Sequence, residues 1–403
     1  MICPEIGNSG NNAFIGGHTN NVIRLSKALH NRGHEITIIT TPHRHPGDQP
    51  SEDLEWAKVV CLPINGSFSS IGFGLEFALK SFNKIRKING KSKFDIIHGH
   101  SGFTMPAIIT GITSMFLNIP SVHSVYCPIQ VNSKSTVKFL SNNALSRFYF
   151  FHIDKVIATS GSVLESLVNA GIAKEKIDLI PPLIGNNFNS SVSGEKIREE
   201  FNILPEQTVV TFVGNLSKIK GIDILIDSLS YLKEEYHDIM LLMVLNLPLS
   251  KYNNPEILEA DAELLPEIKR KIKSYGLEEN VIPIGLTEKM PQIMAASDIF
   301  TMPFLNLVGV ADPPISLIEA MAIGKPVIAT KVGSVSKLVK HKVNGILIDP
   351  GSSVELAEGI KYLIENEKES KEMGKRGSKM IHDNFGDATI IKKIENVYES
   401  VGV

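Results

Sequence analysis

The stretch VADPPISLIEAMAIGKPVIAT, residues 310–330, contains the pattern that decides the fold. It predicts a loop, a short helix, a turn at Gly324 and a buried strand, which is the order of elements expected beside a parallel sheet. The free N–H groups and the dipole of such a helix favour an anion at its N-terminus. Glu319 lies about one turn further along, where its carboxylate can accept hydrogen bonds from hydroxyl groups. These residues therefore predict an anion site beside the helix.

Strand-like and helical patterns alternate along most of the 403 residues, as is typical of parallel sheets covered by helices on both faces. The length favours two domains, and residues 181–187, which are rich in turn formers, separate two series of predicted strands. We expect one α/β domain over residues 1–184 and a second over 185–387. Residues 388–403 have the apolar spacing of a final helix.

Composition and charge exclude several classes of function. With 43% apolar residues, 21% charged residues and a net charge of −2, the chain has neither a disorder pattern nor the bulk positive charge expected of a nucleic-acid binder. The three cysteines are far apart and outside any metal-binding spacing, which indicates reduced thiols in a cytoplasmic protein. The uncharged residues 96–133 are interrupted by glycine and proline, so we expect buried strands and a helix there rather than a membrane span.

Glycine-containing loops precede a predicted helix in each domain. Gly16 and Gly17 come before the first helix, where glycine lets the backbone approach a ligand closely, although such pairs are equally common without a ligand. The segment FVGNLSKIKG, residues 212–221, predicts the matching strand, loop and helix start of the second domain. Its Lys220 can contact phosphate or remain solvated.

Together these motifs resemble those of retaining glycosyltransferases of the GT-B fold, family 4, and the resemblance covers nearly the whole chain. Its most specific part is the pattern Glu-Ala-Met-Ala-x-Gly-x-Pro-Val at residues 319–327. It implies two Rossmann-like α/β domains with parallel sheets facing across a cleft, the sugar donor on the second domain, the acceptor on the first, and the final helix crossing back to the first domain.

The resemblance also implies an enzyme, a hexosyltransferase that needs neither a metal nor another cofactor. Its donor would be a nucleoside-diphosphate sugar, UDP- or GDP-linked, and its acceptor a glycan, a glycolipid or other lipid-linked sugar, or a small hydroxyl compound. The residues implied at the donor are Gly16, Gly17, Asn215, Lys220, Gly285, Leu286, Ile315 and Glu319. Those implied on the acceptor side are His18 and His100, and those implied in catalysis are Lys220, Asp312, Tyr126 and His123.

Three positions depart from the family pattern. Asn215 stands where the family has an arginine that grips the phosphates, and Ala311 where it has the first of two glutamates, with Asp312 as the nearest carboxylate. Tyr126 stands where a histidine is common, so either Tyr126 or His123, from the preceding turn, takes its hydrogen-bonding role. The departures leave an alternative open, a catalytically weak or inactive donor-binding or scaffolding relative. A nicotinamide-dependent dehydrogenase is disfavoured, because neither domain begins with Gly-x-Gly-x-x-Gly.

Residues 77–93 predict a basic amphipathic helix with no acidic residue between Lys80 and Lys93. The solvated outer face of an α/β domain is the simpler interpretation, and the same pattern is also typical of helices that lie on anionic lipid. The sequence thus predicts a cytoplasmic protein, with a peripheral contact to the inner face of the membrane as the alternative for this helix.

Overall fold

The computed structural model describes residues 1–3, 17–41, 53–64, 71–101, 104–129, 150–245 and 264–403. The chain divides into two compact units, which we describe separately. Unit 1 comprises residues 1–183, 309–312 and 387–403, and unit 2 comprises residues 184–308 and 313–386. The division at residue 183 lies one residue from the expected boundary. The sequence did not predict that residues 309–312 would belong to unit 1.

Unit 1 contains a four-stranded parallel sheet in the order β3-β4-β5-β6 and a parallel pair, β1-β2. Ile2 joins them, because it bridges Ile39 of β1 on one side and Gly99 of β3 on the other. The strands are β1 (Thr37–Thr40), β2 (Lys58–Cys61), β3 (Ile97–Ser101), β4 (Ser121–Val125), β5 (Lys155–Ala158) and β6 (Ile177–Leu179). The helices are α1 (Gly17–His30), α2 (Ile71–Asn89), α3 (Thr104–Leu117), α5 (Gly161–Asn169) and α15 (Asp387–Ser400).

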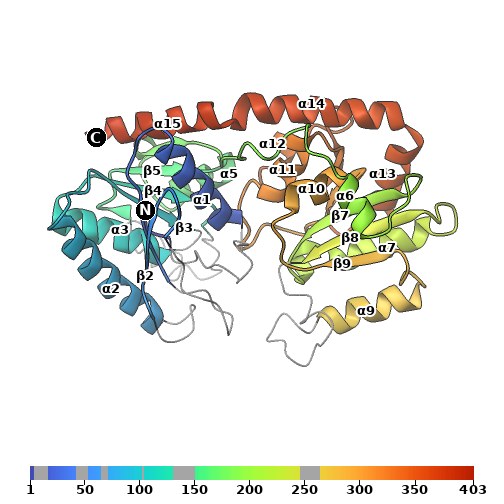
Figure 1. Cartoon of the computed structure of the whole chain (residues 1–403), viewed down its shortest axis with the longest axis horizontal. Coiled ribbons are helices and arrows are strands. Elements are labelled where there is room, and N and C mark those ends of the chain that lie inside the picture. The colour runs from blue at the N-terminus through green and yellow to red at the C-terminus, as the bar shows by residue number, and fades with distance from the viewer. Residues whose placement is uncertain (4–16, 42–52, 65–70, 102–103, 130–149, 246–263) are drawn as a thin grey trace. The chain divides into compact units, whose positions relative to one another are not determined.

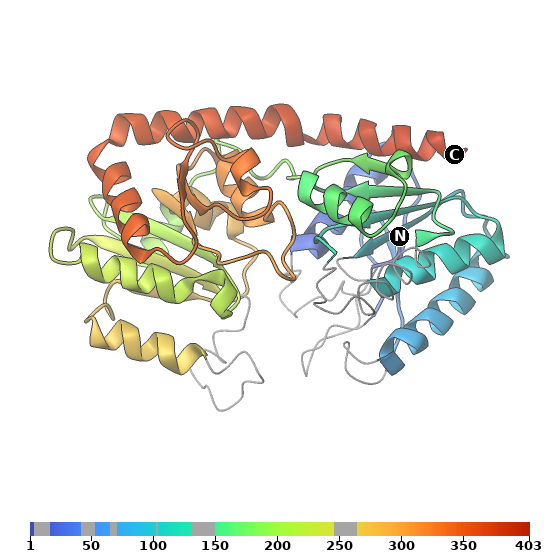
Figure 2. The ribbon, with the colours of Figure 1, turned by 180° about the vertical axis from the view of Figure 1, so that it is seen from behind.

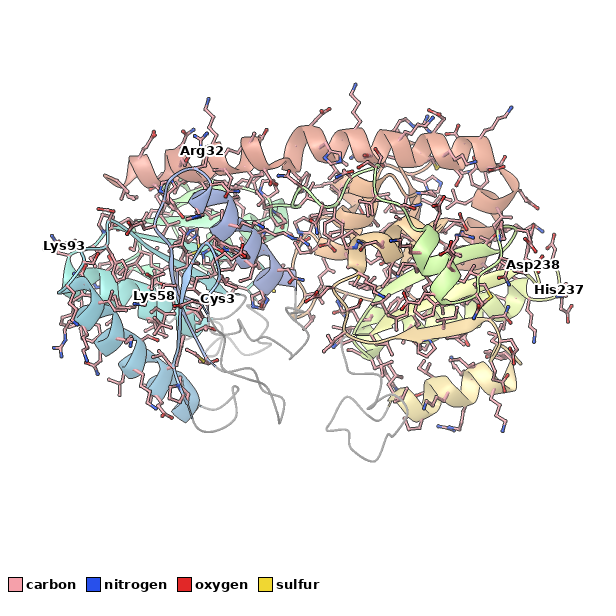
Figure 3. All side chains as sticks on the ribbon, viewed as in Figure 1. Cys3, Arg32, Lys58, Lys93, His237 and Asp238 are labelled. Atoms are coloured by element: carbon pink, nitrogen blue, oxygen red, sulfur yellow. The ribbon has the colours of Figure 1, made fainter. Side chains whose placement is uncertain are left out.

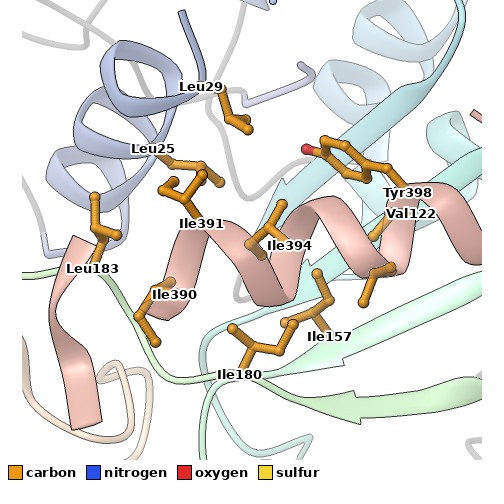
Figure 4. Close-up of a cluster of buried hydrophobic side chains, with 11 residues drawn as sticks. Leu25, Leu29, Val122, Ile157, Ile180, Leu183, Ile390, Ile391, Ile394 and Tyr398 are labelled. Carbon is orange, nitrogen blue, oxygen red and sulfur yellow. The ribbon is translucent and has the colours of Figure 1, made fainter. Parts of the chain in front are cut away.

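The final helix, α15, is buried in unit 1 by an apolar face. Its residues Ile390, Ile391, Ile394 and Val397 pack with side chains from α1 and from strands β4 and β5 (Figure 4). At the surface, Arg32, which is labelled in Figure 3, donates two hydrogen bonds to the carboxylate of Glu395, at 3.1 and 2.9 Å. The predicted final helix and its return to the first domain are therefore confirmed.

Unit 2 contains one six-stranded parallel sheet in the order β12-β11-β10-β7-β8-β9. Its strands are β7 (Thr208–Gly214), β8 (Ile239–Leu245), β9 (Val281–Ile284), β10 (Ile299–Met302), β11 (Val327–Thr330) and β12 (Ile346–Ile348). Its helices are α6 (Glu195–Glu200), α7 (Ile222–Leu232), α9 (Leu264–Ser274), α10 (Met290–Ala296), α11 (Ile315–Ile323), α12 (Val335–Leu338), α13 (Ser353–Glu365) and α14 (Glu367–Phe385).

The order of these strands determines where a ligand can bind. The chain begins in the middle of the sheet with β7, proceeds outward to β9, and returns beside β7 with β10 before it continues to β12. Helix α7 packs against α9 and α13, whereas α11 packs against α10 and α14, so the helices form two groups around the sheet (Figures 1 and 2). The loops after β7 and β10 therefore diverge at a switch point, the usual ligand position in open α/β sheets.

Three buried histidines lie in the sheet of unit 1. His98 and His100 are on β3, with ring centroids 3.9 Å apart, and His123 is on the neighbouring strand β4. Gly99 makes room for His123, since a Cβ atom there would lie 2.3 Å from the Nδ1 atom of that residue. Burial lowers the pKa of all three imidazoles, that of His123 to about 3. The three rings are therefore neutral at physiological pH.

The neutral histidines predict that unit 1 loses stability in acid. The unfolded chain takes up protons below a pKa of about 6.5, whereas the folded rings stay neutral, so stability is present above that pH and falls as the pH decreases. Between pH 7 and 5.5 we expect a loss of about 1 kcal/mol per buried histidine, measured by urea unfolding. His123→Gln should remove one histidine's share of the loss. An equal slope for wild type and His123→Gln would contradict the argument.

Candidate functional site

The loops after β7 and β10 meet at the carboxyl edge of the unit 2 sheet. The two strands are parallel neighbours, and the backbone N–H of Leu305 donates to the carbonyl of Ile219 at 2.7 Å. The Nζ atom of Lys220 lies 3.9 Å from the centroid of the Phe304 ring. A cation over an aromatic face is attracted by the ring quadrupole, so this contact holds the ammonium group at the edge of the sheet.

Gly221 explains why these two loops can approach so closely. It has a φ of +65°, the left-handed region, and a Cβ atom there would lie 2.0 Å from the carbonyl oxygen of Pro303. A short 3₁₀ turn, Lys218–Lys220, precedes it, and α7 begins directly after it. Only glycine satisfies both the conformation and the contact. The backbone therefore fixes the position from which the Lys220 side chain extends.

Helix α11 begins after the β10 loop and presents its first turn at the same edge. The N–H groups of Ile315, Ser316 and Leu317 have no acceptor within the helix, and Pro314, which has no N–H, occupies the N-cap. Glu319 is buried in the second turn of the helix. The helix ends at Gly324, whose φ of +95° and backbone bond to Ala320 are those of a left-handed C-cap. The predicted loop, helix, turn and strand over residues 310–330 are thus confirmed.

The remaining residues implied at the donor lie in different places. Asn215 directly follows β7 and is half-buried, and Gly285 and Leu286 directly follow β9 on the same sheet. Gly17 begins α1 in unit 1, whereas Gly16 lies outside the described residues. In unit 2, Asn215 and Lys220 belong to one loop at the switch point, where α11 also begins. Gly285 and Leu286 lie further along the sheet, after β9.

In unit 1, Tyr126 is at the centre of a buried polar group. Its hydroxyl donates to the Oδ1 atom of Asn21 at 3.1 Å and lies 3.1 Å from the Nδ1 atom of His100. Its ring centroid is 6.0 Å from that of His18. Because its proton is used by Asn21, the hydroxyl oxygen accepts from His100 Nδ1–H, which leaves the lone pair on Nε2. That atom is buried and has no partner among the described residues.

Burial raises the pKa of the Tyr126 phenol well above its usual value, so the group remains protonated and acts by hydrogen bonding. His123 differs from expectation, since it lies inside strand β4 and not in a turn. Its Nε2 atom is 3.1 Å from Ser101 Oγ and its Nδ1 atom 3.4 Å from Thr110 Oγ1. Both ring nitrogens are thus occupied within the core of unit 1, which leaves Tyr126 as the better placed of the two candidates.

Asp312, which we expected to replace the missing glutamate, is instead fully buried in unit 1. Its N–H donates to the carbonyl of Tyr126 at 2.8 Å, and its own carbonyl accepts from Thr159 Oγ1 at 2.8 Å. Its Oδ2 atom accepts from the hydroxyls of Ser160, at 3.0 Å, and Ser162. Ser160 is the N-cap of α5, so the helix dipole also favours the carboxylate there. The structure thus shows Asp312 as a hydrogen-bonded anchor of residues 309–312 in unit 1, and its role in catalysis stays a prediction.

Sequence reasoning missed the partners of Asp312. Ser160 and Ser162 precede an apolar helical pattern, which is a helix-start signal that could have pointed to an anion-accepting N-terminus. Within the described ranges, no group of three or more His, Cys, Asp or Glu side chains could hold a metal ion. In the same part of the chain, no helix is both long and apolar enough to cross a membrane.

Two family models match the chain one after the other. The model described as Glycosyltransferase Family 4 matches residues 15–185, and the model described as Glycosyl transferases group 1 matches residues 193–380. The gap between the two matches lies next to the division between the two structural units at residue 183. Each model therefore corresponds to the main part of one unit.

Similar proteins cover nearly the full chain at low identity. The N-acetyl-alpha-D-glucosaminyl L-malate synthase of Bacillus anthracis is 22% identical over 99% of this chain and 95% of its own. The mannosylfructose-phosphate synthase of Agrobacterium fabrum is 28% identical, over 84% and 76%. Among solved structures, the sucrose-phosphate synthase of Thermosynechococcus elongatus has a TM-score of 0.79 at 19% identity, covering 99% and 98%. Anabaena HepE in complex with UDP-glucose has a TM-score of 0.74 at 22% identity, covering 97% and 98%. These likenesses show the GT-B fold.

The hydrogen bonds of Asp312 predict that substitution of either partner, the carboxylate or the two serine hydroxyls, lowers the free energy of unfolding by a similar amount. Asp312→Ala should lower the free energy of unfolding by about 1–3 kcal/mol, because two hydroxyls and a helix N-terminus lose a buried acceptor. The double variant Ser160→Ala/Ser162→Ala should cause a similar loss, and combining all three substitutions should add little, as measured by urea unfolding. Asp312→Asn, which keeps an acceptor oxygen, serves as the control and should lose less. Full additivity would show that the contact is not the cause.

Proposed function

We propose that this chain, a hexosyltransferase of the glycosyltransferase family 4 type with the GT-B fold, uses a UDP- or GDP-linked sugar as its donor. We propose also that it retains the anomeric configuration and works without a metal ion. The observation that carries the proposal is the position of Lys220 at the switch point, together with the first turn of α11. An ammonium group and free amides at one sheet edge suit a diphosphate. The UDP-glucose complex of HepE supports a nucleotide sugar in this fold.

The proposed reaction separates a negatively charged leaving group from the sugar. When the bond between the anomeric carbon and the diphosphate oxygen breaks, its electron pair stays on that oxygen, so the negative charge there increases. Interactions of Lys220 and the α11 amides with the phosphate therefore strengthen in the transition state, which is the condition for catalysis. The Phe304 ring limits the freedom of the Lys220 side chain, so less reorganisation is needed during the reaction.

The same reasoning assigns roles to the other residues. Glu319 is the remaining family carboxylate on α11 and would accept hydrogen bonds from the ribose hydroxyls of the donor. Asn215 can donate from its side-chain amide, although it adds no charge, and the exposed Lys218 provides a second cation on the same turn. With Asp312 anchored in unit 1, no second carboxylate is required, because a retaining reaction can pass the acceptor proton to the leaving phosphate.

On the acceptor side we propose the surroundings of His18, His100 and Tyr126, which unit 1 brings together. The Nε2 atom of His100 has no partner among the described residues and can accept a hydrogen bond from a hydroxyl group, and the burial of Tyr126 and His100 keeps both uncharged. A neutral polar group of this kind suits a sugar or another polyhydroxyl compound. The acceptor proposed is therefore a hydroxyl of a glycan, a glycolipid or a small molecule.

Lys220 provides the sharpest test of the donor site. Lys220→Ala should lower kcat/KM by about 10²–10³, the usual cost of removing one transition-state donor, because the charge on the leaving phosphate loses its main partner. Lys218→Ala, which removes a cation from the same turn, is the matched control and should change it only several-fold. Release of nucleoside diphosphate from a panel of UDP- and GDP-linked sugars gives the measurement. Equal activity of Lys220→Ala and wild type would disprove the assignment.

Metal independence and catalytic competence can be tested in one set of titrations. We expect UDP or GDP to bind with similar affinity in the presence of EDTA and of Mg²⁺, measured by calorimetry, and turnover to persist in EDTA. Abolition of turnover by EDTA, with recovery on adding Mg²⁺, would contradict the proposed mechanism. Binding of a nucleotide sugar without transfer or hydrolysis for any member of the panel would favour the alternative, a donor-binding relative with little activity.

A further inference from the structure

Large apolar side chains are exposed on the outside of unit 1, where α2 and α3 pack against each other (Figures 1 and 2). On α2, Leu75 is 57% exposed and Leu79 66%. On α3, Met115 is 45% exposed and Phe116 66%. Single exposed apolar residues are common, whereas a cluster of them on adjacent elements indicates an interaction surface.

The helical spacing makes these side chains one continuous surface. Leu75, Leu79 and Phe82 are four and then three residues apart, so they share one face of α2. The rings of Phe82 and Phe116 meet edge to face with centroids 5.9 Å apart, which joins that face to α3. We call this surface the α2–α3 apolar patch, and it consists of Leu75, Leu79, Phe82, Ile112, Met115 and Phe116.

A row of cations lies beside the patch on the same helix. Lys80, Lys84 and Lys87 follow the helical repeat, and Glu76, the only acidic residue of α2, is paired with Lys80 at 2.6 Å. Five cations at this end of unit 1 have no ion pair with any described residue, and the last of them is labelled in Figure 3. They are Lys84, Arg86, Lys87, Lys91 and Lys93.

We propose that α2 and α3 form an interfacial docking surface for an anionic lipid bilayer. A bilayer surface offers both negative headgroups and an apolar region just below them, so it can receive the lysine row and the protruding apolar patch at once. The net charge of the chain is −2, so the rest of the molecule is negative and would be repelled by the same surface. This asymmetry would orient unit 1 with α2 and α3 towards the lipid.

The charge pattern also argues against a second copy of this chain as the occupant. In a two-fold dimer each patch faces its own equivalent, so the unpaired cations of α2 would face the same cations across the interface. The bilayer needs no such compensation. The inference does not rest on the proposed reaction, because it concerns a different part of unit 1, but it would favour a lipid-linked acceptor.

Vesicle sedimentation with the whole chain tests the contribution of the α2 cations to lipid binding. We expect binding to vesicles that contain phosphatidylglycerol, weak binding to phosphatidylcholine alone, and release as salt is increased. Each cation near the surface contributes about a fivefold factor in partitioning, so Lys84→Gln/Lys87→Gln/Lys91→Gln should weaken binding about a hundredfold. The matched control, Lys273→Gln/Lys368→Gln/Lys379→Gln, removes three exposed lysines of unit 2 and should bind as wild type does.

The contribution of the α2–α3 apolar patch is tested with the double variant Leu79→Ser/Phe116→Ser. It should weaken vesicle binding at least tenfold while leaving the melting temperature and nucleotide binding unchanged, because both side chains are mostly exposed. Equal binding of the lysine variant and wild type, or equal binding to neutral and anionic vesicles, would overturn the proposal. A dimer in solution that Phe116→Ser dissociates, without vesicle binding by wild type, would instead assign the patch to a second copy.

Discussion

Gly221 packs directly against the backbone of Pro303, and there is no room for a Cβ atom between them. This contact brings the loop after β7 against the loop after β10, where strand order reverses. Two consequences follow in unit 2. Lys220 is held over the Phe304 ring on one side, and on the other the β10 loop leads into α11, whose first amides have no acceptor within the helix. The candidate donor site therefore depends on a backbone approach that any larger residue would prevent.

Unit 1 is completed by two segments that are distant in sequence and attached by different forces. Helix α15 is held by a large apolar cluster, whose loss on separation would expose many side chains to water. Residues 309–312 are held chiefly through Asp312, by hydrogen bonds to hydroxyl and backbone groups that water could replace. Separation of α15 would expose apolar surface to water, whereas separation of residues 309–312 would expose polar groups that water can hydrogen-bond. The two segments thus differ in the kind of interaction that attaches them to unit 1.

The sequence predicted most of the strands because buried parallel strands are continuous apolar runs between helical patterns, as in β8 or β11. It missed β6, in which the charged Asp178 stands between two apolar residues and breaks the apolar run. The anchoring of Asp312 depends on Ser160 and Ser162, some 150 positions away, which no local pattern can indicate. The uncharged stretch 96–133 was expected to form buried strands and a helix, and within it α3 leaves Phe116 exposed, because composition does not show which face of a helix a neighbour covers.

Charge balance distinguishes the proposed donor site from the family pattern. A helix N-terminus is equivalent to about half a positive charge, so α11 and Lys220 together offer about 1.5 charges to a leaving diphosphate. An arginine at position 215 would add one more, but Asn215 adds only a dipole. Because one positive charge is missing, the position of the remaining ammonium group matters more than the total charge. A fixed ammonium group in a partly dry site interacts more strongly with phosphate than a mobile one in water. The aromatic face beneath Lys220 and the rigid turn at Gly221 supply that placement.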